Sequence, residues 1–292
     1  MTPITITDVR AVSGDGAFLL DDGKTAVLYD TGFAFTGCKI AENIKKVLGS
    51  RPLDYILLTH SHYDHVLGTP YIAKDYPEAK VIAGEYAAQI FQRPSAKAVM
   101  RELDRKAAAK HAMTDYEDLT DQLKVDATVK DGERFRCGDF YFEAVALPGH
   151  TKCSMGFYLR EHKLLLGSET LGVYFGNNTY LPFFLVGYQL TLDAFKKVKQ
   201  LEIEKILLPH YGVVDQEEAQ VYLENSETAV RETAQTMLSM LQDGKTNDEI
   251  LAFFEERDYL DNVKPTYPID AFHLNTSIMI EQIRKELLMK NK

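Results

Sequence analysis

The sequence has few cysteines and no excess of positive charge. Its 292 residues contain only three cysteines, Cys38, Cys137 and Cys153, and no close CxxC pair. This odd, small number excludes a disulfide scaffold and indicates a reducing cytoplasm. Asp and Glu outnumber Lys and Arg by 43 to 33, so the net charge is −10. Such an acidic chain lacks the positive surface that binds nucleic-acid phosphates or an anionic membrane, and neither is expected as a partner.

Long apolar runs are also missing. A membrane span needs about 18 apolar residues, and the longest apolar stretch, around residues 181–186, is much shorter. The first residues, MTPITITDVR, have neither a basic start nor an apolar core, so no secretory signal is predicted. Hydrophobic residues make up 45% and charged residues 26% of the chain. These proportions are typical of a folded globular protein, and we predict a cytoplasmic one.

Short apolar segments and amphipathic segments alternate over the first 215 residues. Strands are predicted within residues 4–31 and at 55–58, 80–83, 140–147, 155–159, 164–166 and 206–208. Helices are predicted at residues 38–48, 68–75, 85–91 and 192–201. The alternation indicates an α/β or α+β domain with a large sheet content.

Two further regions have a helical composition. Residues from about 92 to 124 are rich in Ala and charged helix formers, which predicts a helical insertion. From residue 216 to 292 the pattern is almost wholly helical, with a capping box (TNDE) that begins at Thr246. We therefore predict a sheet domain over residues 1–215 and a helical extension over 216–292 that packs on it.

Three of the eight histidines lie within six residues, in the segment THSHYDH that follows the apolar segment DYILL. The imidazoles are thus placed at the carboxyl end of a predicted strand, where loops form sites. Other apolar segments end in the same way: YFEAVALPG is followed by His150, KLLLGSE ends in Glu169 and KILLP is followed by His210. Histidines and carboxylates at several strand ends are typical of a metal cluster at one edge of a sheet sandwich.

Seven potential ligands are too many for one tetrahedral ion and are appropriate for two. Grouped by ion, they are His60, His62 and His150 for the first, Asp64, His65 and His210 for the second, and Glu169 shared by both. Imidazole and carboxylate suit zinc, and also iron or manganese. A hydroxide that bridges the two ions would be the nucleophile, and Asp64 would help to orient it.

The ordered motifs resemble those of the metallo-β-lactamase-fold hydrolases. They are H-x-H-x-D-H, LPGHT, LLLGSET and LLPHYG, with an earlier YDTG. The resemblance implies that Asp30 of YDTG orients the loop that carries the metal ligands. It also implies an α+β fold, a four-layer αββα sandwich with the metals at one edge. One departure is at the fourth motif, where the family usually has Gly-Asp and this chain has Ser168-Glu169. Whether Glu169 bridges both ions is left open.

A finer resemblance is to the branch that contains the alkylquinolone-signal response thioesterase. It is carried by the helical insertion, the helical tail and the segment YDHVLGTPYI. In that branch the added helices cover the metal site, and the known chemistry is thioester hydrolysis of acyl-CoA-type substrates. This resemblance implies a small-molecule thioester as the substrate.

Several other side chains are candidates for a substrate pocket near the metals. They are Tyr174, Phe175, Tyr180 and Phe183, which follow Glu169 in a loop-like segment, and His273 in the last predicted helix. Core packing is the alternative for the aromatic residues. His111 and His162 are interpreted as solvated structural side chains, and Cys153 as a small buried apolar residue.

The leading hypothesis is a binuclear metal-dependent hydrolase that cleaves an ester-like bond, in particular a thioester. Three alternatives remain at this stage. They are a phosphodiesterase of the same fold, a mononuclear iron oxygenase and a non-enzymatic effector that keeps the metal cluster for its shape. The helical tail is interpreted as a packing element, with a homodimer surface as an open alternative.

Overall fold

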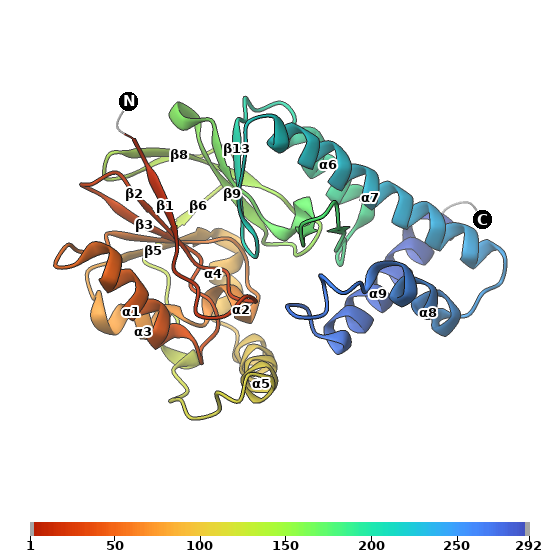
Figure 1. The fold of residues 1–292 in the computed structure, drawn as a ribbon, viewed down its shortest axis with the longest axis horizontal. Coiled ribbons are helices and arrows are strands. Elements are labelled where there is room, and N and C mark those ends of the chain that lie inside the picture. Colours follow the sequence, from red (N-terminus) through yellow and green to blue (C-terminus); the bar gives the residue numbers. More distant parts are fainter. Residues whose placement is uncertain (1–2, 290–292) are drawn as a thin grey trace. The chain divides into compact units, whose positions relative to one another are not determined.

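The computed structural model describes residues 3–289 (Figure 1). The chain forms two compact units. Unit 1 contains the residues up to Ala146 together with Cys153–Gly167, and unit 2 contains Leu147–Lys152 and the chain from Ser168 onward. This division does not test the domain boundary predicted after residue 215, which stays a prediction.

Unit 1 contains a mixed six-stranded sheet in which the strands follow their order in the sequence. The strands are β1 (Thr5–Asp8), β2 (Phe18–Asp21), β3 (Ala26–Tyr29), β4 (Tyr55–Leu58), β5 (Lys80–Gly84) and β6 (Ala127–Val129). The first three are antiparallel hairpin partners, and β3 to β6 run parallel. Parallel neighbours need crossover segments, and here these segments are helical.

The crossover helices cover one face of this sheet (Figure 1). They are α1 (Gly37–Leu48), α2 (Tyr63–Val66), α3 (Thr69–Asp75), α4 (Glu85–Phe91) and α5 (Pro94–Lys110). The register aligns Leu19, Leu28 and Ile56 on this face, where they are fully buried in one apolar core with Ile40 and Ile44 of α1. Burial of these side chains stabilises the sheet by roughly 1.5–3 kcal/mol each.

A second set of strands in unit 1 lies against the opposite face of the sheet. These antiparallel strands are β7 (Arg134–Cys137), β8 (Phe140–Ala146), β9 (Met155–Leu159) and β10 (Leu164–Leu166). Tyr29 points from β3 toward them, and its buried hydroxyl donates to the carbonyl of Gly167 over 2.6 Å. At the start of β9, Met155 N donates to the carbonyl of Thr59 over 2.9 Å. The end of β4, which precedes the first histidines, is therefore held by its own sheet and by a hydrogen bond from β9.

The predicted helical insertion is shorter than expected. Only α5 is a full helix within residues 92–124, and the single 3₁₀ turn η1 (Thr120–Gln122) follows a non-helical segment. Pro94 occupies the first turn of α5, a position that proline favours. The helix ends after Lys110 because Ala112 adopts a positive φ of 53°, which is incompatible with continued helix.

Unit 2 is mainly helical. Its elements are η3 (Glu169–Leu171), β11 (Val173–Tyr174), β12 (Tyr180–Leu181), α6 (Tyr188–Val198), β13 (Lys205–Leu208), β14 (Gly212–Asp215), α7 (Glu217–Gln242), α8 (Asn247–Asp258), α9 (Ile269–Ile283) and the π-helical turn η4 (Arg284–Leu288). The capping box predicted at Thr246 is confirmed, because its hydroxyl accepts from Glu249 N and its own N–H donates to the Glu249 carboxylate.

One helix start in unit 2 differs from the prediction. The helix α6 begins at Tyr188 instead of residue 192, because the Glu286 carboxylate accepts hydrogen bonds from the N–H groups of Tyr188 and Gln189 over 2.9 and 3.1 Å. The last α-helix, α9, begins at Ile269, and residues 290–292 of the predicted helical extension lie outside the described residues. None of the described helices is both long and apolar enough to span a membrane.

Candidate metal centre

Unit 1 carries the segment His60–His65 directly after β4. Asp30, directly after β3, holds this segment through hydrogen bonds to its carboxylate. Its Oδ1 accepts from Thr59 N over 2.8 Å, and its Oδ2 accepts from the Thr59 hydroxyl and from Nδ1 of His65, each over 2.8 Å. All three residues are fully buried. Asp30 thus makes the contacts that an orienting role requires.

The hydrogen bonds of unit 1 assign the ring protons of two histidines. Because the carboxylate of Asp30 only accepts, Nδ1 of His65 carries the proton. The Thr59 hydroxyl uses its proton toward Asp30, so it accepts from Nδ1 of His60 over 2.9 Å. In both rings Nε2 is therefore the nitrogen that can bind a metal.

The imidazoles of unit 1 lie close together. The ring centroid of His60 is 4.6 Å from that of His62 and 4.2 Å from that of His65. The Asp64 carboxylate is 3.5 Å from Nε2 of His65, and its side chain is 19% exposed. Unit 1 alone therefore gathers three imidazoles and one carboxylate after the end of a buried strand.

A glycine far along the chain from the histidines, Gly16, contacts this segment. Gly16 N donates to the carbonyl of Asp64 over 3.2 Å. A Cβ at Gly16 would lie 2.9 Å from Nδ1 of His65, which is closer than ordinary packing allows. Gly14 and Gly16, with Asp15 between them, are typical of a turn. Nothing in this local pattern indicates a contact with a histidine far along the chain.

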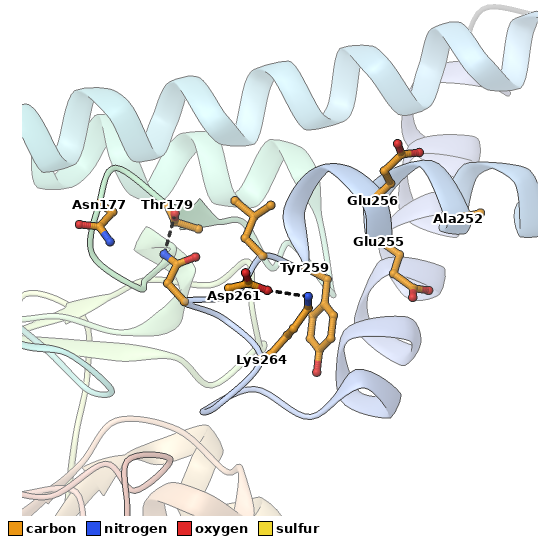
Figure 2. A pocket seen from close by; sticks show the side chains of 10 residues that line it. Asn177, Thr179, Ala252, Glu255, Glu256, Tyr259, Asp261 and Lys264 are labelled. Atoms are coloured by element: carbon orange, nitrogen blue, oxygen red, sulfur yellow. Dashed lines mark hydrogen bonds and ion pairs between the residues drawn. The ribbon is translucent and has the colours of Figure 1, made fainter.

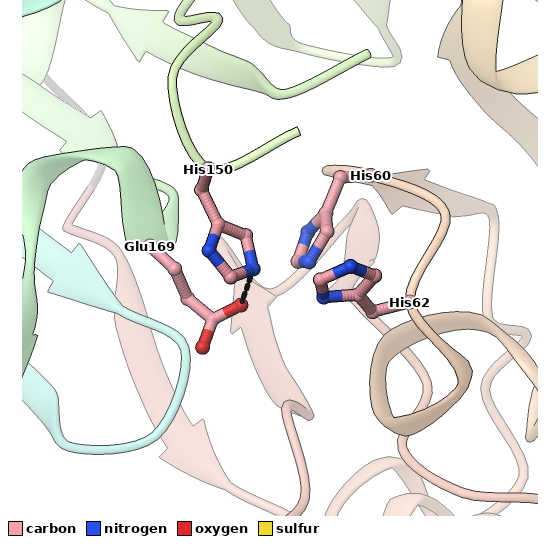
Figure 3. Close-up of side chains that lie close together, drawn as sticks. All are labelled: His60, His62, His150 and Glu169. Atoms are coloured by element: carbon pink, nitrogen blue, oxygen red, sulfur yellow. Dashed lines mark ion pairs between the residues drawn. The ribbon is translucent and has the colours of Figure 1, made fainter. Parts of the chain in front are cut away.

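Unit 2 carries His150, Glu169 and His210. Figure 3 shows His150 and Glu169 with their ion pair. Glu169 Oε2 is 2.8 Å from Nε2 of His150, and its Oε1 is 3.2 Å from Nε2 of His210. Each oxygen of one buried carboxylate thus contacts a different imidazole.

The chemistry of this contact fits a metal. Nδ1 of His150 is 3.2 Å from the carbonyl oxygen of Phe183, which can only accept, so Nδ1 carries the proton. The other nitrogen then lies against a carboxylate oxygen of Glu169, and carboxylates also only accept. Two acceptor atoms at this distance require either a proton between them or a metal ion that both atoms bind. Imidazole and carboxylate are ligands of zinc, iron and manganese.

The aromatic candidates fall into two clusters within unit 2. Tyr174 and Tyr180 pair across β11 and β12 with ring centroids 4.9 Å apart, and Tyr211 packs 4.6 Å from Tyr174. Tyr211 directly follows His210 and was not predicted. Phe175 and Phe183 both contact Tyr267, at centroid distances of 6.1 and 5.2 Å.

His273 does not join either cluster. Its Nε2 pairs over 2.6 Å with the Glu255 carboxylate of α8, and its side chain is 38% exposed. The substrate-pocket roles of His273 and of the four aromatic residues stay predictions.

The remaining candidates have structural surroundings. His111 is exposed and stacks on Phe35 with centroids 5.6 Å apart. His162 lies in the short turn η2 (Arg160–His162) between β9 and β10. Cys153 is buried, and its thiol is 3.3 Å from the hydroxyl of Ser61, between the first two histidines of the motif.

A surface hollow of about 800 Å³ lies elsewhere in unit 2 (Figure 2). Residues of the β11–β12 loop, of the end of α8 and of the segment that follows α8 line it, among them Asn177, Thr179, Glu255, Tyr259, Asn262 and Lys264. Asn262 joins the two sides by donating to the hydroxyl of Thr179 over 2.9 Å. None of the seven predicted metal ligands lines this hollow.

Residues 17–210 match the family model of the metallo-β-lactamase superfamily. The chain belongs to this superfamily. It has the αββα sandwich fold, as predicted, and it carries the His, Asp and Glu groups of a metal site. The matched residues include every predicted ligand, from the first histidine motif to His210.

Individual relatives are distant. The hydroxyacylglutathione hydrolase of Stenotrophomonas maltophilia is 27% identical over 49% of this chain and 41% of its own length. The atrochrysone carboxyl ACP thioesterase of a Cryptosporiopsis species is 24% identical over 55% of this chain and 40% of its own. The chain thus spans about two fifths of the length of these two curated relatives.

Solved structures share the fold. A metallo-β-lactamase family protein of Thermus thermophilus has a TM-score of 0.61 and 20% identity, and the match covers 92% of this chain and 88% of that one. At this level of identity the likeness concerns the fold.

Proposed function

We propose that the chain holds two divalent metal ions. The first ion would be bound by His60, His62 and His150, the second by Asp64, His65 and His210, and Glu169 would bind both. Three observations support this proposal. The family model covers all seven residues. Hydrogen bonds to Asp30 and to the Phe183 carbonyl orient the rings of His65 and His150. The two oxygens of the Glu169 carboxylate contact the imidazoles of His150 and His210. The last observation carries the proposal.

The protein residues would prepare the ions for hydrolysis. Bound zinc, iron or manganese supplies Lewis acidity, which acidifies water and polarises a carbonyl group. Asp30 fixes the ring of His65, and the carbonyl of Phe183 fixes that of His150, so neither ligand has to reorganise. The partly exposed Asp64 carboxylate would orient the attacking water and hold its proton on Oδ2.

We further propose that the substrate is a small-molecule thioester. Two relatives have names that describe thioester hydrolysis, one on glutathione and one on an acyl carrier protein. The resemblance to the alkylquinolone-signal response branch points to the same bond. In this proposal Tyr174, Phe175, Tyr180, Phe183 and His273 belong to the pocket for the acyl group.

The test combines metal analysis with a substrate panel. We expect two equivalents of metal per chain, and faster hydrolysis of acyl thioesters than of model phosphodiesters. His62→Ala should abolish activity and lower the metal content, whereas the matched variant His162→Ala, in the β9–β10 turn, should leave both unchanged. Full activity after complete chelation would refute the proposal. A preference for phosphodiesters, or consumption of oxygen, would refute the thioester assignment while leaving the metal site standing.

A further inference from the structure

The long helix α7 holds the turn that carries Glu169. The hydroxyl of Tyr222 donates to two consecutive carbonyls, those of Leu171 and Gly172, over 2.8 and 2.9 Å. One helical turn further on, the hydroxyl of Ser226 donates to the carbonyl of Leu171 over 2.5 Å. Both side chains are buried, at 2% and 1% exposure. Two neighbouring hydroxyls of one helix are thus committed to the end of η3.

The backbone of η3 approaches α7 more closely than a side chain would allow. Gly172 has a positive φ of 88°, and a Cβ there would lie 2.2 Å from Oγ of Ser226. Only glycine satisfies both conditions. The contact between helix and turn is therefore direct, and no residue intervenes that could absorb a shift of the helix.

The same turn, η3, holds both Glu169 and the backbone of His150. Glu169 begins it, and the Glu169 carbonyl accepts from Gly172 N over 3.0 Å. The Thr170 hydroxyl accepts from His150 N over 3.1 Å and donates to the carbonyl of Leu147 over 2.6 Å. A displacement of η3 would move both Glu169 and the backbone of His150.

We propose that Tyr222 and Ser226 are positioning residues for the metal centre, and this inference rests on the proposed binuclear site. By holding η3, they set the Glu169 carboxylate where each oxygen contacts a different imidazole. Glutamate has one more rotatable bond than the aspartate usual in the family, so its carboxylate needs a more firmly fixed backbone to keep one orientation. Helix α7 would in this way support the metal site without supplying a ligand.

The test measures metal affinity in Tyr222→Phe and Ser226→Ala. Loss of an outer hydrogen-bond partner typically lowers metal affinity about 10–100-fold. We expect the affinity for one of the two ions to fall by about that factor in equilibrium dialysis against a chelating indicator. The kcat should fall with occupancy and recover in excess metal, while KM for the thioester stays close to the wild-type value.

Two matched variants separate this role from a general loss of stability. Tyr259→Phe removes another tyrosine hydroxyl of unit 2 that donates to a carbonyl, that of Tyr267, over 2.8 Å. Thr228→Ala removes an exposed hydroxyl from α7 that donates to the carbonyl of Glu224 over 2.8 Å. Both should bind two ions with wild-type affinity.

The outcomes distinguish this inference from the proposed function. If the wild-type chain binds two ions and both test variants bind them equally tightly, the positioning role is refuted and the binuclear site stands. If the wild-type chain binds fewer than two ions, the proposed function fails and the inference fails with it. If Tyr222→Phe does not fold, Ser226→Ala decides the question, because it removes one anchoring hydroxyl and leaves the packing of the Tyr222 ring unchanged.

Discussion

Asp30 and His65 are joined by a buried hydrogen bond of 2.8 Å between Oδ2 and Nδ1. The same carboxylate holds Thr59 through two further bonds, so one side chain links β3 to the start and the end of the histidine segment. A carboxylate behind a ligand imidazole fixes its tautomer and raises its basicity. Metal affinity should therefore depend on a residue that is not itself a ligand.

We predict that Asp30→Asn lowers metal affinity about 10–100-fold. The amide keeps the size of the side chain but loses the charge and one acceptor, so the His65 ring is held less firmly. Metal content after dialysis is the measurement. Asp54→Asn is the control, because that carboxylate accepts a backbone hydrogen bond from Ala26 over 2.8 Å at a strand end without metal ligands. Equal metal content in both variants would contradict the prediction.

A second prediction concerns the close approach of Gly16 to His65. In Gly16→Ala the added methyl would lie 2.9 Å from Nδ1, so the ring or the backbone must move. Overpacking of this kind costs about 1–3 kcal/mol of unfolding free energy, and here it should also impair metal binding. Gly132→Ala provides the comparison, since its positive φ of 73° causes strain but no atom lies within 4 Å of the new methyl. That variant should lose stability and keep its metal.

The sequence predicts features that depend on neighbouring residues, and it does not predict contacts between residues far apart in the chain. Strands such as β4 and helices such as α1 were predicted because the spacing of their apolar residues is a local signal. The histidine motif was found because it follows a strand. By contrast, contacts such as Gly16 with His65 pair residues far apart in the chain, and no local pattern records them.

The same reason explains which boundaries were missed. The start of α6 is set by Glu286 near the end of the described chain, and the hairpin of β11 and β12 is too short for a period of two residues to be visible. Tyr222 has ordinary helical neighbours, so its two carbonyl partners near Glu169 could only be seen in the folded structure.

We expect the stability of unit 1 to depend on pH through Asp104. This α5 carboxylate is buried and accepts from Ala34 N over 2.8 Å and from the Tyr116 hydroxyl over 2.5 Å. Burial raises the pKa of Asp104 from 3.8 to about 6. Between these values the folded state binds more protons than the unfolded state, so its contribution to stability falls as the pH rises from about 4 to about 6.

The size of this effect follows from the shift in pKa, at about 3 kcal/mol or less. Asp104→Asn should remove it, because the amide cannot titrate. The measurement is the difference in unfolding free energy between wild type and variant, from urea titrations at several pH values. The variant should gain relative stability as the pH rises from 4 to 6; a difference independent of pH would contradict the assignment.

Glu286 is predicted to stabilise α6 from a distance. Its carboxylate caps two N–H groups at the start of that helix, and loss of such a cap costs about 0.5–2 kcal/mol. Glu286→Gln should lower the unfolding free energy by part of this amount, since the amide keeps one acceptor. Glu281→Gln, which alters an exposed ion pair with Arg284, should change stability by less than about 0.5 kcal/mol.

The final prediction concerns the length of the side chain at residue 169. Glu169 reaches Nε2 of His150 with one oxygen and Nε2 of His210 with the other, over 2.8 and 3.2 Å. Glu169→Asp shortens this reach by one methylene while η3 stays anchored to α7, so the carboxylate should contact only one imidazole. The variant should retain one tightly bound ion and lose affinity for the other about 10–100-fold.

Glu169→Gln tests charge at constant length. It should weaken both ions, because a neutral amide oxygen is a poorer ligand than a carboxylate and leaves the positive charge less compensated. Metal equivalents and dissociation constants, measured for both variants beside wild type, separate the two effects. If the aspartate variant held two ions as tightly as the wild type, a side chain of that length would be sufficient, and the prediction that the second ion depends on the extra methylene of Glu169 would be wrong.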